Sequence, residues 1–462
     1  MLDNKVIGDV LDQALSTGGD FAEIFLEDTR NNSITMIGGI VERTISGREY
    51  GLGLRIFNGL NSVYAYTNDT SRENLLSVAK KAAMAIKGTK MDLVLNFQKQ
   101  EITNAHPIVK IPKDISQKEK VAIMKRAHEV ANNYSEEISQ VVVNYLDNEQ
   151  KVLIANSDGK IVEDTRIRTR LPIQAIASKG TEKQSGFHGP GALKGFELYD
   201  EINIEDYAKD AAQIATTMIN AEACPSGKMP VIIDNAFGGV IFHEACGHGL
   251  EATSVAKKTS VFSDKIGEQV ASELVTAVDD GTMPNEWGSL NIDDEGNPTK
   301  RNVLIENGVL KGYMIDSLNG KRMGMEATGS CRRQNYRFAP TSRMTNTYID
   351  NGSSTPEEII ANTEYALYAK NMGGGSVNPA TGEFNFAVNE GYIVKNGKID
   401  RPVRSATLIG RGIDVLKKID MVGNNLKQAP GMCGSVSGAV PTNVGQPMIR
   451  VSEITVGGRK GE

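Results

Sequence analysis

Two histidines five residues apart, His243 and His248, restrict how the segment VIFHEACGHGLE (240–251) can fold. The metal-binding signature His-Glu-x-x-His places its histidines four residues apart, on one face of a helix. Five residues turn a regular helix by about 500°, which leaves the two side chains roughly 140° apart. A straight helix therefore cannot direct both imidazoles toward one ion.

The segment can still form a metal site if its backbone departs from a regular helix. A π-type turn, or a helix that ends between the histidines, would bring the two rings together. Gly247 and Gly249 flank His248, and glycine tolerates left-handed or strained backbone at little cost, so we expect a break here. Glu244 then stands where a zinc hydrolase needs its general base. The structural alternative is a plain helix cap beside a packed Cys246.

The chain is too long for one ordinary core, because 462 residues exceed the ~100–200 residues of a typical domain. A helical period runs through residues 205–223 and is interrupted by Pro225 and Gly227. We therefore expect two domains, an N-terminal helix and strand domain over 1–224 and a β-rich domain over 225–462 that carries the histidine motif.

Local patterns predict an α+β fold in both halves. The stretches MIGGIVERT (36–44) and EYGLGLRIF (49–57) indicate short strands bounded by turns. Asn-Gly pairs at 307–308 and 396–397 lie between apolar arms and predict tight hairpins. Thr355, with proline next and glutamate three residues on, predicts a capped helix that continues to the glycines at 373–375.

Composition excludes several classes of partner. The net charge is -6 with no run of like charge, which disfavours a nucleic-acid surface. No apolar run reaches the ~18 residues of a membrane helix, and the acidic N-terminal segment does not resemble a signal peptide. The four cysteines are too widely spaced for a disulfide framework, so we expect a reducing cytoplasm. They are Cys224, Cys246, Cys331 and Cys433.

A third metal ligand must come from outside the histidine pair. The other histidines all precede the second domain, at positions 106, 128 and 188. Carboxylate candidates follow the motif: Glu251, Asp279, Asp280 and Glu295. Cys433 is a further candidate, since it lies in a glycine- and proline-rich stretch expected to expose its thiol. Cys246, between the histidines, is the local alternative.

Two adjacent arginines are a weaker signal. Arg332 and Arg333 could hold a peptide carboxylate or a developing oxyanion, although paired arginines more often form surface salt bridges. Tyr336 and His188 are further donor candidates for the oxyanion.

Several motifs together resemble one family. The resemblance covers nearly the whole chain, and its specific motifs lie after residue 230. These motifs are HEACGHGLE, DDGTMPNEWGSLNIDDEG (279–296), TGSCRR (328–333), SRMTNTYI (342–349), PGMCG (430–434) and VGQPMIRVSEITVGG (444–458). They are similar to the TldD half of the TldD/PmbA family, once called modulators of DNA gyrase.

The resemblance implies a zinc metalloprotease whose ligands are His243, His248 and Cys433, with Glu244 as catalytic base. It also implies dimers that enclose a chamber, formed with a second copy or with a PmbA-like chain, and substrates that are unfolded or peptide-like. In the family, the stretch after the cysteine usually reads Gly-Lys-x-Gly-Gln, whereas residues 434–439 read GSVSGA here. Substrate contacts of that Lys or Gln are therefore not carried over.

The sequence thus favours a zinc-dependent peptidase that acts on flexible polypeptides. The alternative is a non-catalytic regulator or scaffold that binds partner proteins, as the gyrase-modulator name suggests. A pure scaffold has no need of a base beside a metal, so the combination of three ligands with Glu244 favours the enzyme.

We expect Cys433→Ser to lose most of the bound zinc and all activity, whereas Cys246→Ser keeps both. Three ligands within six residues would leave Glu244 little freedom, and a distant thiolate completes the coordination while leaving a fourth position open. Loss of a ligand should also lower the melting temperature, because metal-binding free energy is partly folding free energy. Zinc content and melting curves of the two variants decide this, and an empty site in Cys246→Ser would contradict the assignment.

Overall fold

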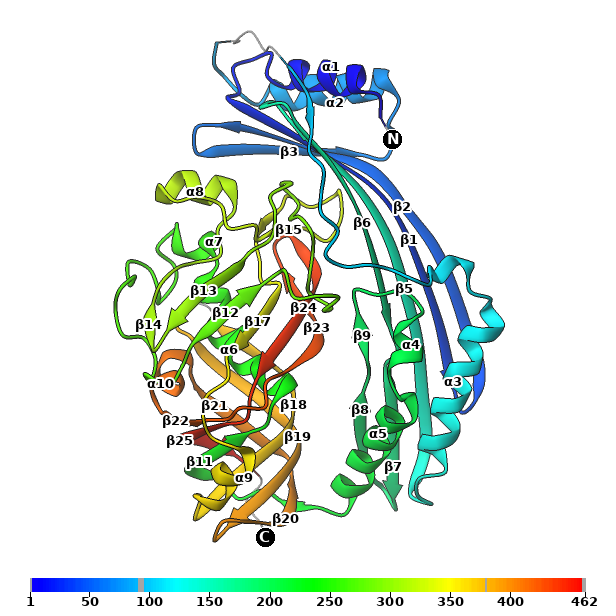
Figure 1. Cartoon of the computed structure of the whole chain (residues 1–462), viewed down its shortest axis with the longest axis vertical. Helices are drawn as coiled ribbons and strands as arrows, with labels where there is room; N and C mark the ends of the chain where they lie inside the picture. Colours follow the sequence, from blue (N-terminus) through cyan, green and yellow to red (C-terminus); the bar gives the residue numbers. More distant parts are fainter. Residues whose placement is uncertain (1, 90–94, 379, 459–462) are drawn as a thin grey trace.

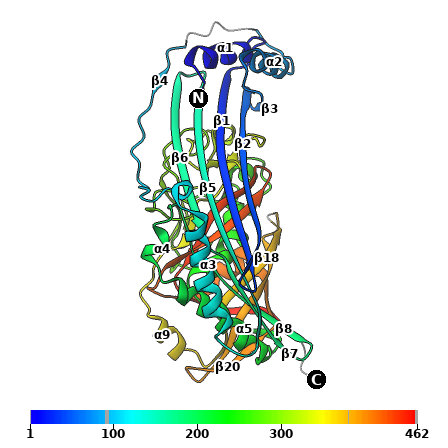
Figure 2. The ribbon, with the colours of Figure 1, turned by 90° about the vertical axis from the view of Figure 1, so that its right-hand side faces the viewer.

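Four long strands run along one side of the molecule (Figures 1 and 2). The computed structural model describes residues 2–89, 95–378 and 380–458. The long strands are β1 (Phe21–Ile37), β2 (Ile40–Asn58), β5 (Ile138–Asn156) and β6 (Lys160–Arg170), within a nine-stranded sheet ordered β3-β2-β1-β5-β6-β4 along its main path. The other elements of this half are α1 (Asn4–Ala14), β3 (Asn61–Thr67), α2 (Arg72–Ala83), β4 (Gln98–Lys99), α3 (Gln117–Asn132), β7 (Ile173–Lys179), β8 (Glu182–His188), β9 (Gly191–Ala192), α4 (Leu198–Glu201) and α5 (Ile204–Ile219).

The long sheet is covered on both faces near the start of β1. Ile24 and Leu26 pack in a core cluster with α1 and α2, which lie across one end of the strands (Figure 1). Phe25 points to the opposite face and packs against Tyr336 of the second half. Alternate residues of a strand face opposite sides, so a segment covered on both faces is buried at nearly every position. This double cover joins the two halves of the chain.

The second half holds an eight-stranded and a six-stranded sheet. Their orders along the main path are β10-β20-β19-β18-β11-β25-β21 and β14-β13-β12-β17-β24-β23. The strands are β10 (Glu222–Ala223), β11 (Gly227–Ile233), β12 (Ala277–Asp280), β13 (Arg301–Glu306), β14 (Val309–Leu310), β15 (Cys331–Arg332), β16 (Thr341–Ser342), β17 (Asn346–Ile349), β18 (Tyr365–Asn378), β19 (Glu383–Lys395), β20 (Lys398–Arg404), β21 (Ala406–Arg411), β22 (Ile419–Val422), β23 (Lys427–Ser435), β24 (Gly438–Gln446) and β25 (Ile449–Gly457). The helices are α6 (Val240–Ala245), α7 (Ala252–Val255), α8 (Ser317–Met323), α9 (Pro356–Ala361) and α10 (Gly412–Lys417).

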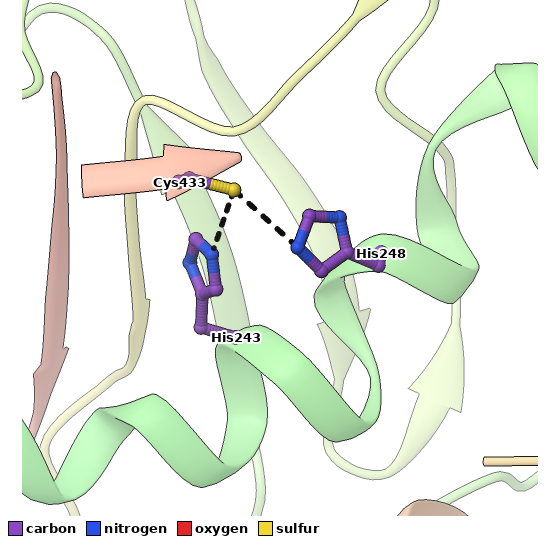
Figure 3. A group of neighbouring side chains, drawn as sticks. All are labelled: His243, His248 and Cys433. Atoms are coloured by element: carbon purple, nitrogen blue, oxygen red, sulfur yellow. Dashed lines mark hydrogen bonds between the residues drawn. The ribbon is translucent and has the colours of Figure 1, made fainter. Parts of the chain in front are cut away.

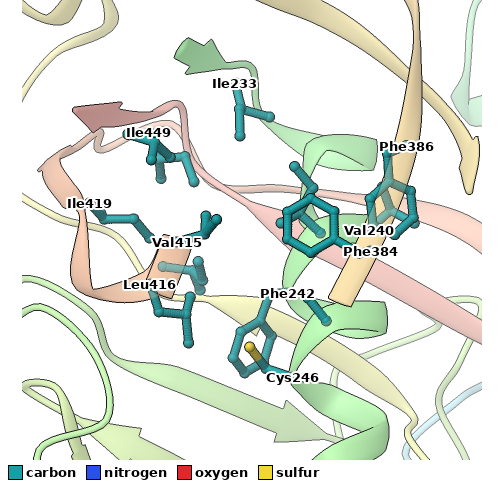
Figure 4. Packing of buried hydrophobic residues seen from close by; sticks show 14 of the residues in the cluster. Ile233, Val240, Phe242, Cys246, Phe384, Phe386, Val415, Leu416, Ile419 and Ile449 are labelled. Carbon is teal, nitrogen blue, oxygen red and sulfur yellow. The ribbon is translucent and has the colours of Figure 1, made fainter. Parts of the chain in front are cut away.

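The short helix α6 lies in the largest hydrophobic core of this half. Val240, Ile241, Phe242 and Ala245 are all buried, and Phe384 and Phe386 of β19 belong to the same cluster (Figure 4). Burial of these four apolar side chains of α6 holds the helix in place against the sheet. The core therefore fixes the position of the histidine motif that follows this apolar stretch.

A buried ion-pair network connects the long sheet to the second half. Arg55 of β2 lies 3.0 Å from Glu23 and 2.5 Å from Glu295, and Arg333 lies 3.0 Å from the other oxygen of Glu23. The side chains in these pairs are at most 3% exposed. Removing one member would leave a buried charge without its partner, which costs about 3–5 kcal/mol in other proteins. The network therefore holds the two halves in one relative position.

The α+β fold class is confirmed, with strand predominating. The nine-stranded sheet uses only β1–β9 and the other sheets use β10–β25, while the boundary after residue 224 stays a prediction. In the described part of the chain, none of the helices has the length and apolarity needed to cross a membrane.

The predicted tight hairpins are confirmed, but the predicted lengths of one strand and one helix are wrong. Asn307 and Asn396 have positive φ in turns that join β13 to β14 and β19 to β20. Of the two short strands expected over 36–57, residues 36–37 are the end of β1 and residues 40–57 lie in the continuous β2, whose pairing with β1 runs through Gly47 without a turn. The capping box at Thr355 is present, yet α9 ends at Ala361 and the glycines lie in β18.

Candidate metal centre

The helix that carries His243 ends before it reaches His248. Helix α6 stops at Ala245, Cys246 leaves the helical region with φ −130° and ψ −44°, and a 3₁₀ turn follows over Gly247–Leu250. The expected break between the histidines is therefore confirmed, in the form of a helix end rather than a π-type turn. The tighter turn rotates His248 back toward His243.

The two glycines of the motif serve a different purpose from the one expected. Neither Gly247 nor Gly249 has a positive φ, so left-handed backbone is not what selects glycine here. A Cβ at Gly247 would lie 2.3 Å from the Met344 sulfur, and one at Gly249 would lie 2.9 Å from the Phe262 ring. Glycine is needed at both positions because Met344 and Phe262 already fill the space that a larger residue would require.

Three side chains converge in the way a metal site requires (Figure 3). The Cys433 Sγ lies 3.2 Å from His243 Nε2 and 3.3 Å from His248 Nε2. The candidate ligand atoms of the three residues all lie within 4.8 Å of one another. Tetrahedral zinc, with Zn–S near 2.3 Å and Zn–N near 2.0–2.1 Å, sets sulfur and nitrogen ligands about 3.5 Å apart. The donor set therefore fits a zinc ion, while the ligand roles themselves stay predictions.

Cys433 is buried, which corrects the expectation of an exposed loop cysteine. It lies on β23, opposite Val440 of β24, and is 4% exposed. The glycines and prolines around it suggested a loop, but antiparallel pairing along the whole of β23 overrides that local preference. The strand holds the thiol in a fixed position over the end of α6.

The two histidines make Cys433 a thiolate. Burial opposes ionisation of this thiol, but His243 and His248 outweigh it and lower the Cys433 pKa to about 3. Burial likewise disfavours the charged form of His248, yet Glu251 and the Cys433 sulfur raise the His248 pKa well above its usual value. A metal binds thiolate and replaces protons on its ligands, so this proton-sharing cluster is a pre-formed receptor for a cation.

Cys246 lies apart from the three convergent residues. Its side chain is fully buried in the hydrophobic core, next to Phe242 and near Leu416 (Figure 4). Burial raises the pKa of its thiol, so this sulfur is protonated and behaves as a small apolar group. Its place in the core offers no support for a compact His-Cys-His site.

Glu251 lies behind His248 rather than among the converging atoms. Its Oε2 is 3.2 Å from His248 Nδ1, which directs the opposite ring nitrogen toward Cys433. Its Oε1 is 3.7 Å from the guanidinium of Arg343, and Arg343 also donates to the Cys433 carbonyl oxygen. Carboxylates that orient metal-binding histidines in this way tune both geometry and affinity. From the sequence, Glu251 is expected only as a direct ligand, although its spacing of three from His248 is the signal of this contact.

Glu244 is the accessible acid of the site. Its side chain is 28% exposed, and its Oε2 lies 3.6 Å from His248 Nε2, the ring nitrogen that faces Cys433. A carboxylate that is close to the candidate ligand atoms and also reaches solvent can exchange protons with a water there.

The remaining candidates have structural partners elsewhere. Asp279 accepts hydrogen bonds from Thr345 and Thr347, and Glu295 pairs with Arg55. The other polar candidates are also placed away from the three convergent residues: Asp280 bonds Thr282, His188 pairs with Asp210, and Arg332 donates to main-chain carbonyl oxygens.

Comparison with known families gives matches across the chain. Models of the PmbA/TldA metallopeptidase match as domain 1 over residues 22–86, as the central domain over 110–219 and as the C-terminal domain over 226–458. The chain is 35% identical to the metalloprotease TldD homolog of Buchnera aphidicola (strain APS) over 448 residues, which are 95% of this chain and 93% of that one. It is 33% identical to a metalloprotease of Methanocaldococcus jannaschii, with 94% and 96% covered. These names support a peptidase role and imply a metal ion.

Solved structures show the same fold. A proposed modulator of a DNA gyrase from Thermotoga maritima superposes with a TM-score of 0.82 at 25% identity, over 98% of this chain and all of the other. TldE from Thermococcus kodakarensis superposes with a TM-score of 0.79 at 19% identity, over 98% and 99% of the two chains. The second likeness concerns the fold alone.

We expect Glu251→Gln to weaken zinc binding by about 10–100-fold, because an amide holds the His248 ring less firmly than a carboxylate does. Competition between the full chain and a chromophoric chelator measures this affinity. Glu268→Gln is the matched control, since Glu268 is exposed and pairs with Lys265 at the surface. Equal zinc affinity of Glu251→Gln and the control would refute an orienting role for Glu251.

Proposed function

Because this chain belongs to the PmbA/TldD family of metallopeptidases, we propose that it is a zinc-dependent peptidase that cleaves unfolded or flexible polypeptides. One observation carries the proposal. His243, His248 and Cys433 converge from two distant segments, and the accessible carboxylate of Glu244 stands beside them. Three protein ligands leave a fourth position open, which is the arrangement of catalytic rather than structural zinc.

Each of these residues has a separate role in the proposed peptide hydrolysis. Zinc bound at such a site polarises a carbonyl and makes water a better nucleophile near neutral pH. His243, His248 and Cys433 supply the donor atoms, and Glu251 holds the His248 ring in its orientation. Glu244 accepts a proton from the attacking water and later delivers it to the departing amine nitrogen.

Burial of the site supports flexible substrates. His243 is 3% exposed and Cys433 is 4% exposed, so the candidate ligands lie below the surface. The peptide bonds of a compact domain are held in secondary structure and cannot reach side chains below the surface, whereas an extended chain presents one bond at a time. We therefore place unfolded or peptide-like chains as the substrates.

We also propose a dimer, either of two copies or with a PmbA-like chain, whose subunits enclose the site. The outer edge of β2 supports an interface. Within the described residues β3 pairs with β2 only from Leu52 to Asn58, so the preceding part of β2 has no strand on that side. Ile40 and Ile45 on this part are exposed. An unpaired strand edge with apolar side chains favours association.

Other features bear on compartment and on the scaffold alternative. All four cysteines are buried and free, which supports a reducing compartment, and we propose the cytoplasm. The alternative of a non-catalytic regulator or scaffold is less favoured, because an acid poised beside a thiolate–histidine cluster has no use in a protein that only binds partners.

We expect Glu244→Ala to keep its zinc and to lose cleavage of an unfolded test peptide by ~10²–10⁴-fold, since removal of a general base has that cost. Zinc content and peptide turnover are measured on the same preparation, and Glu268→Ala at the exposed surface is the control. Retention of more than a few per cent of activity would remove Glu244 from the role of base.

We expect the enzyme to cut a sequence within a peptide or a denatured chain and to spare the same sequence within a folded domain. The physical reason is the recessed position of the candidate ligands. A stable domain and a destabilised variant of it, mixed with enzyme and analysed by mass spectrometry, test this. Equal cutting rates for the two would contradict restricted access.

A further inference from the structure

A cavity of about 510 Å³ lies between the long sheet and the hairpin that carries Cys433. Met432 and Pro441, which face each other across the β23–β24 hairpin, line it. The Cys433 side chain contacts His243 instead, and neighbouring residues of a strand point to opposite faces. Met432 therefore projects toward the cavity and Cys433 toward the metal centre, and Val440, the partner of Cys433 on β24, also lines the cavity, so the two sites adjoin the same two-stranded ribbon.

The floor of the cavity is a set of polar rows across the long strands. Asn31 of β1 pairs with Asn148 of β5, which pairs with Arg168 of β6. In the next row on that face, Leu146 of β5 pairs with Arg170 of β6. Asn148 donates a 2.7 Å hydrogen bond to Asn31. The floor thus changes from amide groups on β1 and β5 to guanidinium groups on β6.

Three arginines at this cavity have no carboxylate partner. In the described parts of the chain, no carboxylate oxygen lies within 4.0 Å of Arg168, Arg170 or Arg332, whereas Arg166 and Arg333 beside them form ion pairs. Their hydrogen bonds go to main-chain carbonyl oxygens: Arg168 to Trp287 and Ser289, Arg170 to Pro430, and Arg332 to Met344 and Pro441.

The absence of a direct ion pair has an energetic consequence. Arg168 and Arg332 are at most 4% exposed, and the buried Nε of Arg170 has no hydrogen-bond partner among the described residues. A buried cation without a directly bonded anion is costly. Burial lowers the pKa of all three guanidinium groups, although the charge of Asp294 acts in the opposite direction on Arg168 and Arg332. An anion that enters the cavity would relieve this cost, with a guanidinium fork suited to bind its two oxygens.

The rest of the cavity indicates which anion fits. Four acids line it too: Glu27, Glu49, Asp147 and Asp294. Asp147 pairs with Lys120 and Asp294 pairs with Arg166, whereas Glu27 and Glu49 lie at the side formed by β1 and β2. The strands β2 and β6 are three spacings apart in the sheet, which is about 14 Å. A polyphosphate or a nucleic acid would meet these acids, whereas a peptide can place one carboxylate at the arginines and leave neutral groups along the amides.

We propose that this cavity binds a carboxylate of the polypeptide substrate, either the C-terminal carboxylate or an acidic side chain, through Arg168, Arg170 and Arg332. The proposal deepens the peptidase function and rests on it for its biological meaning. Arg170 and Trp287 also donate to the carbonyl oxygens of Pro430 and Gly431 on β23. The anion site is therefore connected through one strand to Cys433.

Trp287 provides a direct readout of binding. It is the single tryptophan of the chain, it lines the cavity, and its ring centre lies 5.5 Å from the Arg170 guanidinium carbon. Three peptides of equal length are titrated into zinc-loaded Glu244→Ala while its fluorescence is recorded. One has a free C-terminus and neutral side chains, one has an amidated C-terminus and an internal glutamate, and one is amidated and neutral throughout.

We expect a saturable fluorescence change with at least one of the acidic peptides, and at least ~10-fold weaker binding of the neutral peptide, as loss of a charge-assisted hydrogen bond predicts. Tight binding of the first peptide identifies the C-terminal carboxylate as the ligand, and tight binding of the second identifies an acidic side chain. Equal binding of all three peptides, or no binding of any, would overturn the proposal.

Two substitutions assign the binding to the arginines. Arg170→Met should reduce the preference for the acidic peptide by about 10-fold, and Arg170→Lys should retain part of it, because a lysine keeps the charge without the fork. Arg126→Met is the control, since Arg126 pairs with Glu205 on the surface. An unchanged preference in Arg170→Met, with a melting curve like that of the parent, would refute the site. The protein with Glu244 unchanged is tested for cleavage in parallel. If acidic peptides bind but this protein cleaves none of them, the anion site is supported and the peptidase function is refuted.

Discussion

The contact of Cys433 with His243 and His248 is the constraint on which the candidate site depends. It requires α6 to end at Ala245, since a continuous helix would direct the second histidine away from the first. It also requires β23 to pair with β24 along its length, so that the thiol projects over the helix end. Two further features support this contact. The apolar residues of α6 hold the helix in the core, and the glycines at 247 and 249 let the following turn pack closely against Met344 and Phe262.

The sequence predicts those parts of the molecule that short-range chemistry determines. The turn at Asn307-Gly308, the capping box at Thr355 and the break in the histidine motif each depend on a few neighbouring residues. The α+β class follows from the same patterns. The convergence of Cys433 with the histidines did not follow from spacing, and it was anticipated only because a family resemblance pointed to it.

Long-range packing explains what the sequence could not predict. The sequence predicts separate short strands over 36–44 and 49–57, but pairing with β1 carries β2 straight through Gly47 between them. Cys433 lies among glycines and prolines, yet the partner strand β24 buries it. The same holds for Arg168, Arg170 and Arg332: alternation along a strand places the first two on one face, but only the fold shows that none of the three forms an ion pair within the described residues. The first two facts depend on the neighbouring strand of the sheet, and the contacts of Arg168 and Arg170 depend on residues more than a hundred positions away.

The 190 residues between His243 and Cys433 also affect when this chain could become active. A ribosome that adds roughly 5–20 residues per second needs about 10–40 s to reach Cys433 after it has made His243. Throughout that interval the nascent chain holds the two histidines and Glu244 without the thiolate that completes the cluster. A chain released early, at any point before β23, would lack it permanently. The order of residues along the polypeptide thus keeps the candidate site incomplete until β23 has been made.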